Sequence, residues 1–168
     1  MKTILEAVWT EVCELIQQGS VPSEPTLQAM FVSLLVGKIP DCIVVCEPHL
    51  NIAGEPYAFK PDIVVVLNND ILVFAELKMD LLKCPVWEQD VYKLRTLLKH
   101  AQALDIFVDP ATGKYGDQRL KIAANCLAVF AAVSRSDCQA TRDGLPTEGI
   151  PDSQWLHLKF QTKPGIGI

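Results

Sequence analysis

Two short apolar runs separated by three polar residues constrain this chain more than any other stretch. The runs are Ile63–Leu67 and Ile71–Phe74, and the residues between them are Asn68, Asn69 and Asp70. Runs rich in β-branched residues, interrupted by residues that tolerate turn dihedrals, predict the two strands of a β-hairpin. We therefore expect the chain to fold around a sheet that contains this hairpin.

Charged residues lie at the open end of the predicted hairpin. Asp62 precedes the first strand, and Glu76 and Lys78 end the second. Glu76 and Lys78 share one face because strand side chains alternate. If a three-residue loop is centred on Asn69, Asp62 lies opposite Glu76 with Cβ atoms about 4.5–5.5 Å apart. A two-residue turn would place the two carboxylates on opposite faces unless a bulge restored the register.

The paired carboxylates of Asp62 and Glu76 would repel each other unless a proton or a divalent cation lay between them. Oxygen ligands of this kind suit Mg²⁺ or Mn²⁺. On the same face, Lys78 would position or activate a water molecule, or offset the negative charge that develops on a phosphate. The alternative interpretation is an ordinary amphipathic hairpin whose end charges are solvated.

The pattern Pro61-Asp62, thirteen intervening residues, then Glu76-Leu77-Lys78 resembles the PD-(D/E)xK nuclease superfamily. This group includes restriction endonucleases, Holliday-junction resolvases and RecB-type nucleases. The resemblance implies an α/β fold with a restriction endonuclease-like αβββαβ core, in which helices flank a mixed sheet. It also implies that Asp62, Glu76 and the backbone carbonyl of Leu77 bind Mg²⁺ or Mn²⁺, with Lys78 as the catalytic helper.

Two glutamates compete for a further acidic position that the resemblance implies. The run Ser23–Thr26 predicts a helix start, with a capping serine and a proline in the first turn, and the helix is expected to reach about Gly37. Members of the superfamily often carry an acidic metal ligand near this start, where Glu24 fits. Others carry it on the first core strand, where Glu47 follows Ile43–Cys46. The alternative role of Glu24 is to complement the helix dipole.

The helix predicted after Lys78 spans residues 86–104. RecB-type nucleases carry a glutamine and a tyrosine on this helix, and Gln89 and Tyr92 are similar, at a spacing one residue shorter than the usual one. The resemblance makes Gln89 a candidate substrate-binding residue. Lys93, which lies off the apolar stripe of the helix, is a candidate phosphate contact. The alternative for Lys93 is an exposed helix charge.

The remaining chain predicts a single domain, since 168 residues suffice for one core. An amphipathic helix over residues 3–18 precedes the core, and an irregular hairpin is expected over 105–119. Residues 122–133 predict a buried strand, with a short helix as the alternative. The predicted organisation has four parts: an N-terminal helical segment 1–22, the nuclease-like core 23–134, a polar loop 135–154, and a last edge strand with a tail over 155–168.

The charge distribution is uneven along the chain, whose net charge is −5. Residues 1–82 carry four basic against eleven acidic residues, net −7, whereas residues 83–121 carry seven against five, net +2. Acidity therefore gathers where a metal would be held, and the basic excess follows where phosphates would be met. The six cysteines lie mostly in apolar stretches and predict reduced, buried thiols.

The sequence also indicates the cellular compartment of the protein. Glu6, Glu11 and Glu14 interrupt the apolar residues at the start of the chain, which is unlike the apolar region of a signal peptide. No apolar run approaches the roughly 18–20 residues that span a bilayer. We expect a cytoplasmic protein without a membrane partner.

The function predicted from these residues is metal-dependent phosphodiester hydrolysis of nucleic acid, with DNA as the expected partner and endonuclease cleavage as the expected reaction. The alternative is a catalytically inactive nuclease-fold module that binds nucleic acid or protein within a larger complex. A third interpretation, an α/β protein without a nucleic-acid role, is favoured by the pI of 5.1. A homodimer would supply the two sites that cutting both strands of a duplex needs.

Overall fold

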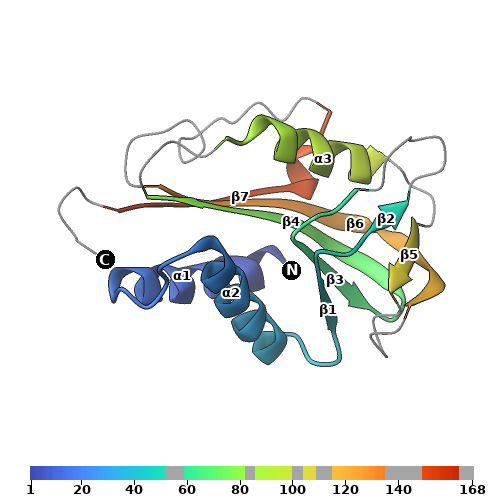
Figure 1. Cartoon of the computed structure of the whole chain (residues 1–168). Coiled ribbons are helices and arrows are strands. Elements are labelled where there is room, and N and C mark those ends of the chain that lie inside the picture. The colour runs from blue at the N-terminus through green and yellow to red at the C-terminus, as the bar shows by residue number, and fades with distance from the viewer. Residues whose placement is uncertain (52–58, 82–85, 100–103, 109–114, 135–148, 163–168) are drawn as a thin grey trace.

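The computed structural model describes residues 1–51, 59–81, 86–99, 104–108, 115–134 and 149–162. Within these ranges a mixed β-sheet lies between two layers of helix (Figure 1). Helices α1 (Lys2–Gln17) and α2 (Glu24–Lys38) cover one face of the sheet, and α3 (Glu88–Lys99) covers the other. The predicted α/β class, with helices on both sides of a mixed sheet, is confirmed.

The central part of the sheet has the strand order β1-β3-β4-β6-β7 in the described chain. These strands are β1 (Ile43–Cys46), β3 (Ile63–Leu67), β4 (Asp70–Asp80), β6 (Tyr115–Ser134) and β7 (Trp155–Gln161). The pairs β1–β3 and β3–β4 are antiparallel, whereas β4–β6 and β6–β7 are parallel. Because β4 and β6 run in the same direction, a crossover must join them, and α3 lies within it.

Two short strands extend the sheet beyond its central part. The first residues of β6 pair with β5 (Leu104–Val108), and β5 in turn pairs with β2 (Leu50–Asn51). The irregular hairpin predicted over 105–119 is thereby confirmed, and it makes β6 longer than the predicted 122–133. The predicted helix over 86–104 is wrong at its end, because α3 ends at Lys99 and Leu104 already belongs to β5.

Local sequence accounts for the two N-terminal helices. The buried residues of α1 recur at helical spacing, with Leu5, Val8, Val12 and Ile16 facing the core. At the start of α2 the Ser23 hydroxyl accepts a hydrogen bond from the Thr26 N–H at 3.4 Å, and a proline follows in the first turn. Both predicted helices are confirmed to within a residue or two at each end.

Side-chain alternation along β3 and β4 divides the hydrophobic core in two. Val65, Ala75 and Leu77 face α1 and α2, whereas Val64 and Phe74 face α3. Even-numbered residues at the open end of this hairpin therefore project towards α3. This alternation decides on which side of the sheet the charged residues of the hairpin lie.

The turn between β3 and β4 differs from the predicted three-residue loop. It contains two residues, Asn68 and Asn69, with φ of 52° and 68°, the left-handed conformation that a two-residue hairpin turn requires. A β-bulge follows, because Val65 pairs with Val73 while Val66 pairs with Ile71. The bulge restores the register that the predicted loop would have given, and Asp62 comes opposite Glu76.

The cysteines match the expected burial only in part. Cys126 is buried and Cys13 and Cys42 are partly buried, but Cys46 at the end of β1 is exposed, so the expectation is wrong for Cys46. Cys84, Cys138 and most of the polar loop 135–154 lie outside the described residues. None of the helices in the described ranges combines the length and hydrophobicity that crossing a bilayer requires.

Replacing Asn68 by valine should destabilise the hairpin, because a β-branched residue at positive φ costs about 1–2 kcal/mol. The free energy of unfolding, measured by urea denaturation, should fall by that amount. Asn68→Gly is the matched control and should lose no stability, since glycine adopts positive φ freely. A valine variant as stable as the wild type would contradict the left-handed turn.

Candidate functional site

Asp62 is held at the open end of the hairpin by three neighbouring elements. Its Oδ2 accepts a hydrogen bond from the backbone N–H of Leu77 on β4 at 2.6 Å. Its backbone carbonyl accepts hydrogen bonds from Gln28 Nε2 on α2 at 2.8 Å and from the N–H of Glu47 at 2.9 Å. Burial raises the pKa of Asp62, against the opposing effects of the Leu77 hydrogen bond and the charge on Lys78.

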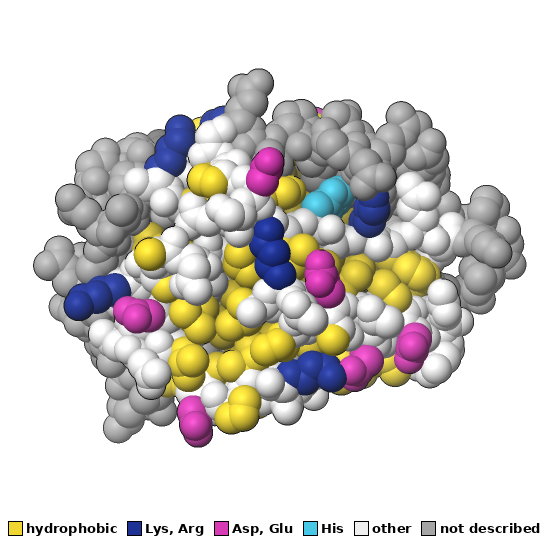
Figure 2. Space-filling model, turned by 180° about the vertical axis from the view of Figure 1, so that it is seen from behind, with side chains coloured by type: hydrophobic (Ala, Val, Ile, Leu, Met, Phe, Trp, Pro, Cys, Tyr) yellow, Lys and Arg dark blue, Asp and Glu magenta, His cyan; other side chains and the backbone are white. Residues whose placement is uncertain are grey.

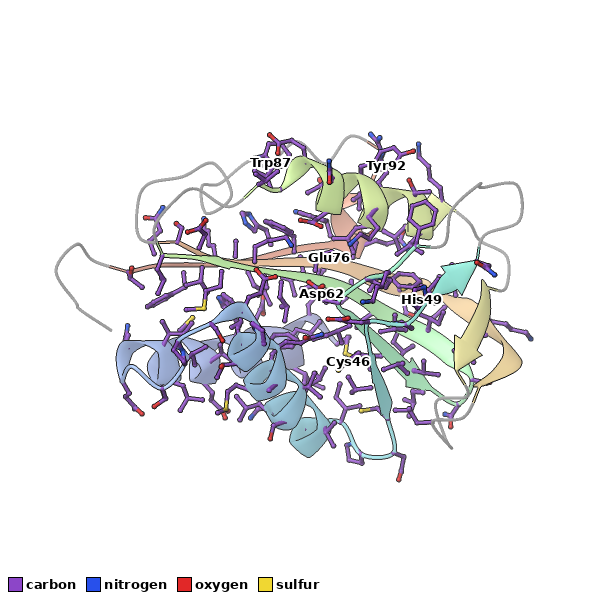
Figure 3. All side chains as sticks on the ribbon, viewed as in Figure 1. Cys46, His49, Asp62, Glu76, Trp87 and Tyr92 are labelled. Carbon is purple, nitrogen blue, oxygen red and sulfur yellow. The ribbon has the colours of Figure 1, made fainter. Side chains whose placement is uncertain are left out.

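Glu76 is fully buried between β4 and α3, next to Asp62 (Figure 3). Its Oε1 lies 2.7 Å from Lys93 Nζ, and beyond this ion pair neither carboxylate oxygen accepts a hydrogen bond from the described residues. Burial, and secondarily the charge of Asp62, raises the pKa of Glu76 to about 9, although Lys93 acts in the opposite direction. A buried carboxyl group with an unpaired oxygen is costly, which makes a purely structural role a poor explanation.

Lys78 lies between two acidic side chains, one from α2 and one from α3. Its Nζ is 3.5 Å from Asp90 Oδ2 on α3 and 3.8 Å from Glu24 Oε1 on α2. Burial lowers the pKa of Lys78, but the charges of Asp90 and Glu24 outweigh that effect and raise the pKa overall. Lys78 therefore keeps its proton at neutral pH, and in this arrangement it acts as a cation and not as a base.

The two candidates for the extra acidic position lie in different surroundings. Glu24 Oε2 accepts a hydrogen bond from the N–H of Met79 at 2.9 Å, while its other oxygen faces Lys78. This contact joins the start of α2 to the end of β4. Glu47 instead forms an ion pair with Lys60, and its side chain is exposed. The geometry thus brings Glu24, and not Glu47, to Lys78.

A polar cleft of about 280 Å³ opens beside Lys78. It is lined by residues of α2, β4 and α3 and by Val86: Glu24, Lys78, Met79, Asp80, Val86, Gln89 and Asp90. Gln89 therefore lies where a substrate in the cleft would contact it. Tyr92, its predicted companion, is outside this lining and is 52% exposed, with the Arg95 guanidinium 5.2 Å from its ring centre.

Lys93 and Asp90 belong to the cluster of charged side chains between α3 and the sheet. Lys93 contacts Glu76 and Asp90 and donates a hydrogen bond to the carbonyl of Lys60 at 3.1 Å, so it is not the exposed helix charge of the alternative interpretation. Its role as a phosphate contact stays a prediction. Asp90 was missed from the sequence, although it contacts both Lys78 and Lys93 and is only 9% exposed. The signal was its three-residue spacing from Lys93, which puts both on one face of a helix.

The side chains that could act as metal ligands determine which ion the site can bind. Across the described ranges no three His, Cys, Asp or Glu side chains are arranged to hold a metal ion. Asp62 and Glu76 nevertheless offer two neighbouring carboxylates, and the unpaired Glu76 Oε2 is an oxygen that a cation would satisfy. These residues fit Mg²⁺ or Mn²⁺ as partial ligands, with Lys93 in competition for Glu76.

Comparisons with known proteins find no match for this chain, whether a family model, a curated protein or a solved structure. The residues of the site therefore carry the inference about function.

The raised pKa of Glu76 predicts how stability depends on pH. The folded state holds a proton on Glu76 over a range in which the unfolded state, with an ordinary pKa of 4.5, does not. The stabilising contribution is fully present below about pH 4.5 and is lost as pH rises towards 9, so the free energy of unfolding should fall by a few kcal/mol over that range.

Glu76→Gln should remove this dependence because glutamine does not titrate. Urea denaturation at pH 5, 7 and 9 would measure how the free energy of unfolding changes with pH. Glu6→Gln, at an exposed site on α1, is the control and should keep the wild-type pH dependence. An unchanged pH dependence in Glu76→Gln would show that another group carries the effect.

Proposed function

We propose that this protein is a metal-dependent phosphodiesterase of the PD-(D/E)xK type that acts on nucleic acid as a DNA endonuclease. The observation that carries the proposal is the buried Glu76 carboxyl group, which lies beside Asp62 with one oxygen unpaired. The Lys78 cation projects from the same face of β4. Lys78 lines the polar cleft, and the buried carboxyl groups lie on the same face of the hairpin behind it, an arrangement that would suit chemistry on an anionic substrate.

The order of elements supports the proposal. From α2 the chain passes through β1, β3, β4 and α3 to β6, with two antiparallel pairings followed by a parallel one. This is the αβββαβ order that the sequence resemblance implies, with β2 and β5 as additions. The proposed restriction endonuclease-like core rests on this order together with the placement of Asp62, Glu76 and Lys78 at one end of the hairpin.

Each residue of the site would have a distinct task. Asp62, Glu76 and the Leu77 carbonyl would hold Mg²⁺ or Mn²⁺, which when bound supplies a Lewis acid and an activated water. Lys78 would stabilise the negative charge that develops on the phosphate as the P–O bond breaks. Glu24 would orient Lys78, since it contacts the ammonium group and is fixed by the Met79 N–H.

Surface charge suggests from which side nucleic acid approaches. On the face shown in Figure 2, basic and acidic side chains are scattered among hydrophobic ones, and the described residues form no continuous basic patch there. Helix α3, which borders the cleft, carries Lys93, Arg95 and Lys99 within its twelve residues. We propose that a DNA backbone lies along the α3 side, with Gln89 as a substrate contact.

The competing function, a binding module without catalysis, is favoured by a different observation. Lys78 and Lys93 contact Glu24, Asp90 and Glu76, so the lysine charges of the site are balanced without a metal. Such a module would bind DNA in a salt-dependent way and leave it intact. Cleavage separates the two functions.

Asp62→Ala and Lys78→Ala should each abolish metal-dependent DNA cleavage. Loss of a group that stabilises charge in the transition state typically lowers the rate by about 100-fold or more. The measurement is nicking of supercoiled plasmid, and cutting of a branched DNA, in Mg²⁺ or Mn²⁺.

Lys38→Ala is the matched control, because Lys38 forms its ion pair with Glu11 between α1 and α2, on the other side of the sheet. Its cleavage rate should equal that of the wild type. A wild type that binds DNA but cuts neither substrate would favour the binding module. Variants that cut as fast as the wild type would refute the roles of Asp62 and Lys78 in cleavage.

A further inference from the structure

Lys93 is surrounded by oxygen atoms from three different segments. Its Nζ lies 2.7 Å from Glu76 Oε1 on β4, 3.5 Å from Asp90 Oδ1 on α3 and 3.1 Å from the carbonyl oxygen of Lys60. Only 23% of the side chain is exposed. Carboxylate and carbonyl oxygens that converge on one cation are the type of ligand that hard divalent cations take.

We propose that Lys93 is a built-in counter-ion of the site, which leaves Glu76 when a divalent cation binds and returns when that cation departs. The inference rests on the proposed function, because the cation is the metal that Asp62 and Glu76 would share. It adds a regulatory residue to the site. In the metal-free protein the Lys93 ammonium group occupies Glu76, and it must leave before the metal can bind there.

Electrostatic repulsion favours exchange over joint occupancy. An ammonium group and a metal cation on the same carboxylate repel each other, and a divalent cation repels twice as strongly as a monovalent one. Lys93 already lies at hydrogen-bonding distance from one oxygen of Glu76. A metal bound to the same buried carboxylate would therefore repel the ammonium group from it.

Asp90 gives the displaced lysine a second partner. It lies one helical turn before Lys93 and contacts it through Oδ1, while its Oδ2 contacts Lys78. The long and flexible lysine side chain can leave Glu76 and keep its contact with Asp90 without any movement of α3. Lys93 would then lie near the cleft, where a phosphate of the substrate could use its charge.

Removing the Lys93 charge should make metal binding stronger. In Lys93→Met the metal no longer competes with an ammonium group for Glu76, while the apolar stem of the side chain is retained. We expect the dissociation constant for Mn²⁺, measured by isothermal titration calorimetry, to fall at least about tenfold, which corresponds to 1.4 kcal/mol. Mn²⁺ should also raise the melting temperature of Lys93→Met by more than that of the wild type.

The control is Lys99→Met, which removes the same charge from the exposed end of the same helix. It should bind Mn²⁺ as the wild type does. If Lys93→Met binds Mn²⁺ no more tightly than the wild type, the exchange is refuted while the metal site and the proposed function stand. If none of the three proteins binds Mn²⁺, the exchange is refuted as well, and the cleavage assay decides the function separately.

A second measurement needs no variant, which matters if Lys93→Met fails to fold. Reductive methylation of the wild-type protein, followed by mass spectrometry, reports how accessible each lysine is. Mn²⁺ should increase the labelling rate of Lys93, because the amine is released from Glu76, and should leave that of Lys99 unchanged. A Lys93 labelling rate that does not rise at Mn²⁺ concentrations that stabilise the protein would overturn the exchange.

Discussion

The burial of the Glu76 carboxyl group is the constraint on which the rest of the site depends. A carboxylate without solvent contact, beside a second carboxylate, can exist only if a proton or a cation offsets its charge. In this protein the Lys93 ammonium group contacts one oxygen and leaves the other unpaired. Lys93 and its ion pair with Asp90 therefore lie where the buried carboxyl group needs an offsetting charge.

Two independent structural features bring the groups of the site together. The two-residue turn and the bulge set the register that puts Asp62 opposite Glu76. The apolar face of α3, through Leu94 and Leu97, packs on the sheet and thereby carries its charged residues to β4. The first feature is local in sequence and the second depends on the crossover between two parallel strands. A change in the hairpin register or in the packing of α3 would separate the charged groups of the site, which stabilise one another only when they are in contact.

The sequence predicted what is local and failed where distant segments meet. The hairpin, the shared face of Glu76 and Lys78, the helix start at Ser23 and the last strand were all readable from periodicity and turn residues. The length of the turn could not be predicted, because a two-residue turn with a bulge and a three-residue loop give the same register at the site. The partners of Lys93 could not be read from sequence, since they depend on where the crossover helix is placed.

The backbone at Leu77 joins the two faces of the sheet. Its side chain is buried in the core beneath α1 and α2, its N–H holds Asp62, and its neighbours in the chain are Glu76 and Lys78. A shift of Leu77 on the side that α1 and α2 cover would change the spacing of the charged groups on the α3 side. The residues that α1 and α2 can accept are therefore restricted by the charged groups on the opposite face of the sheet.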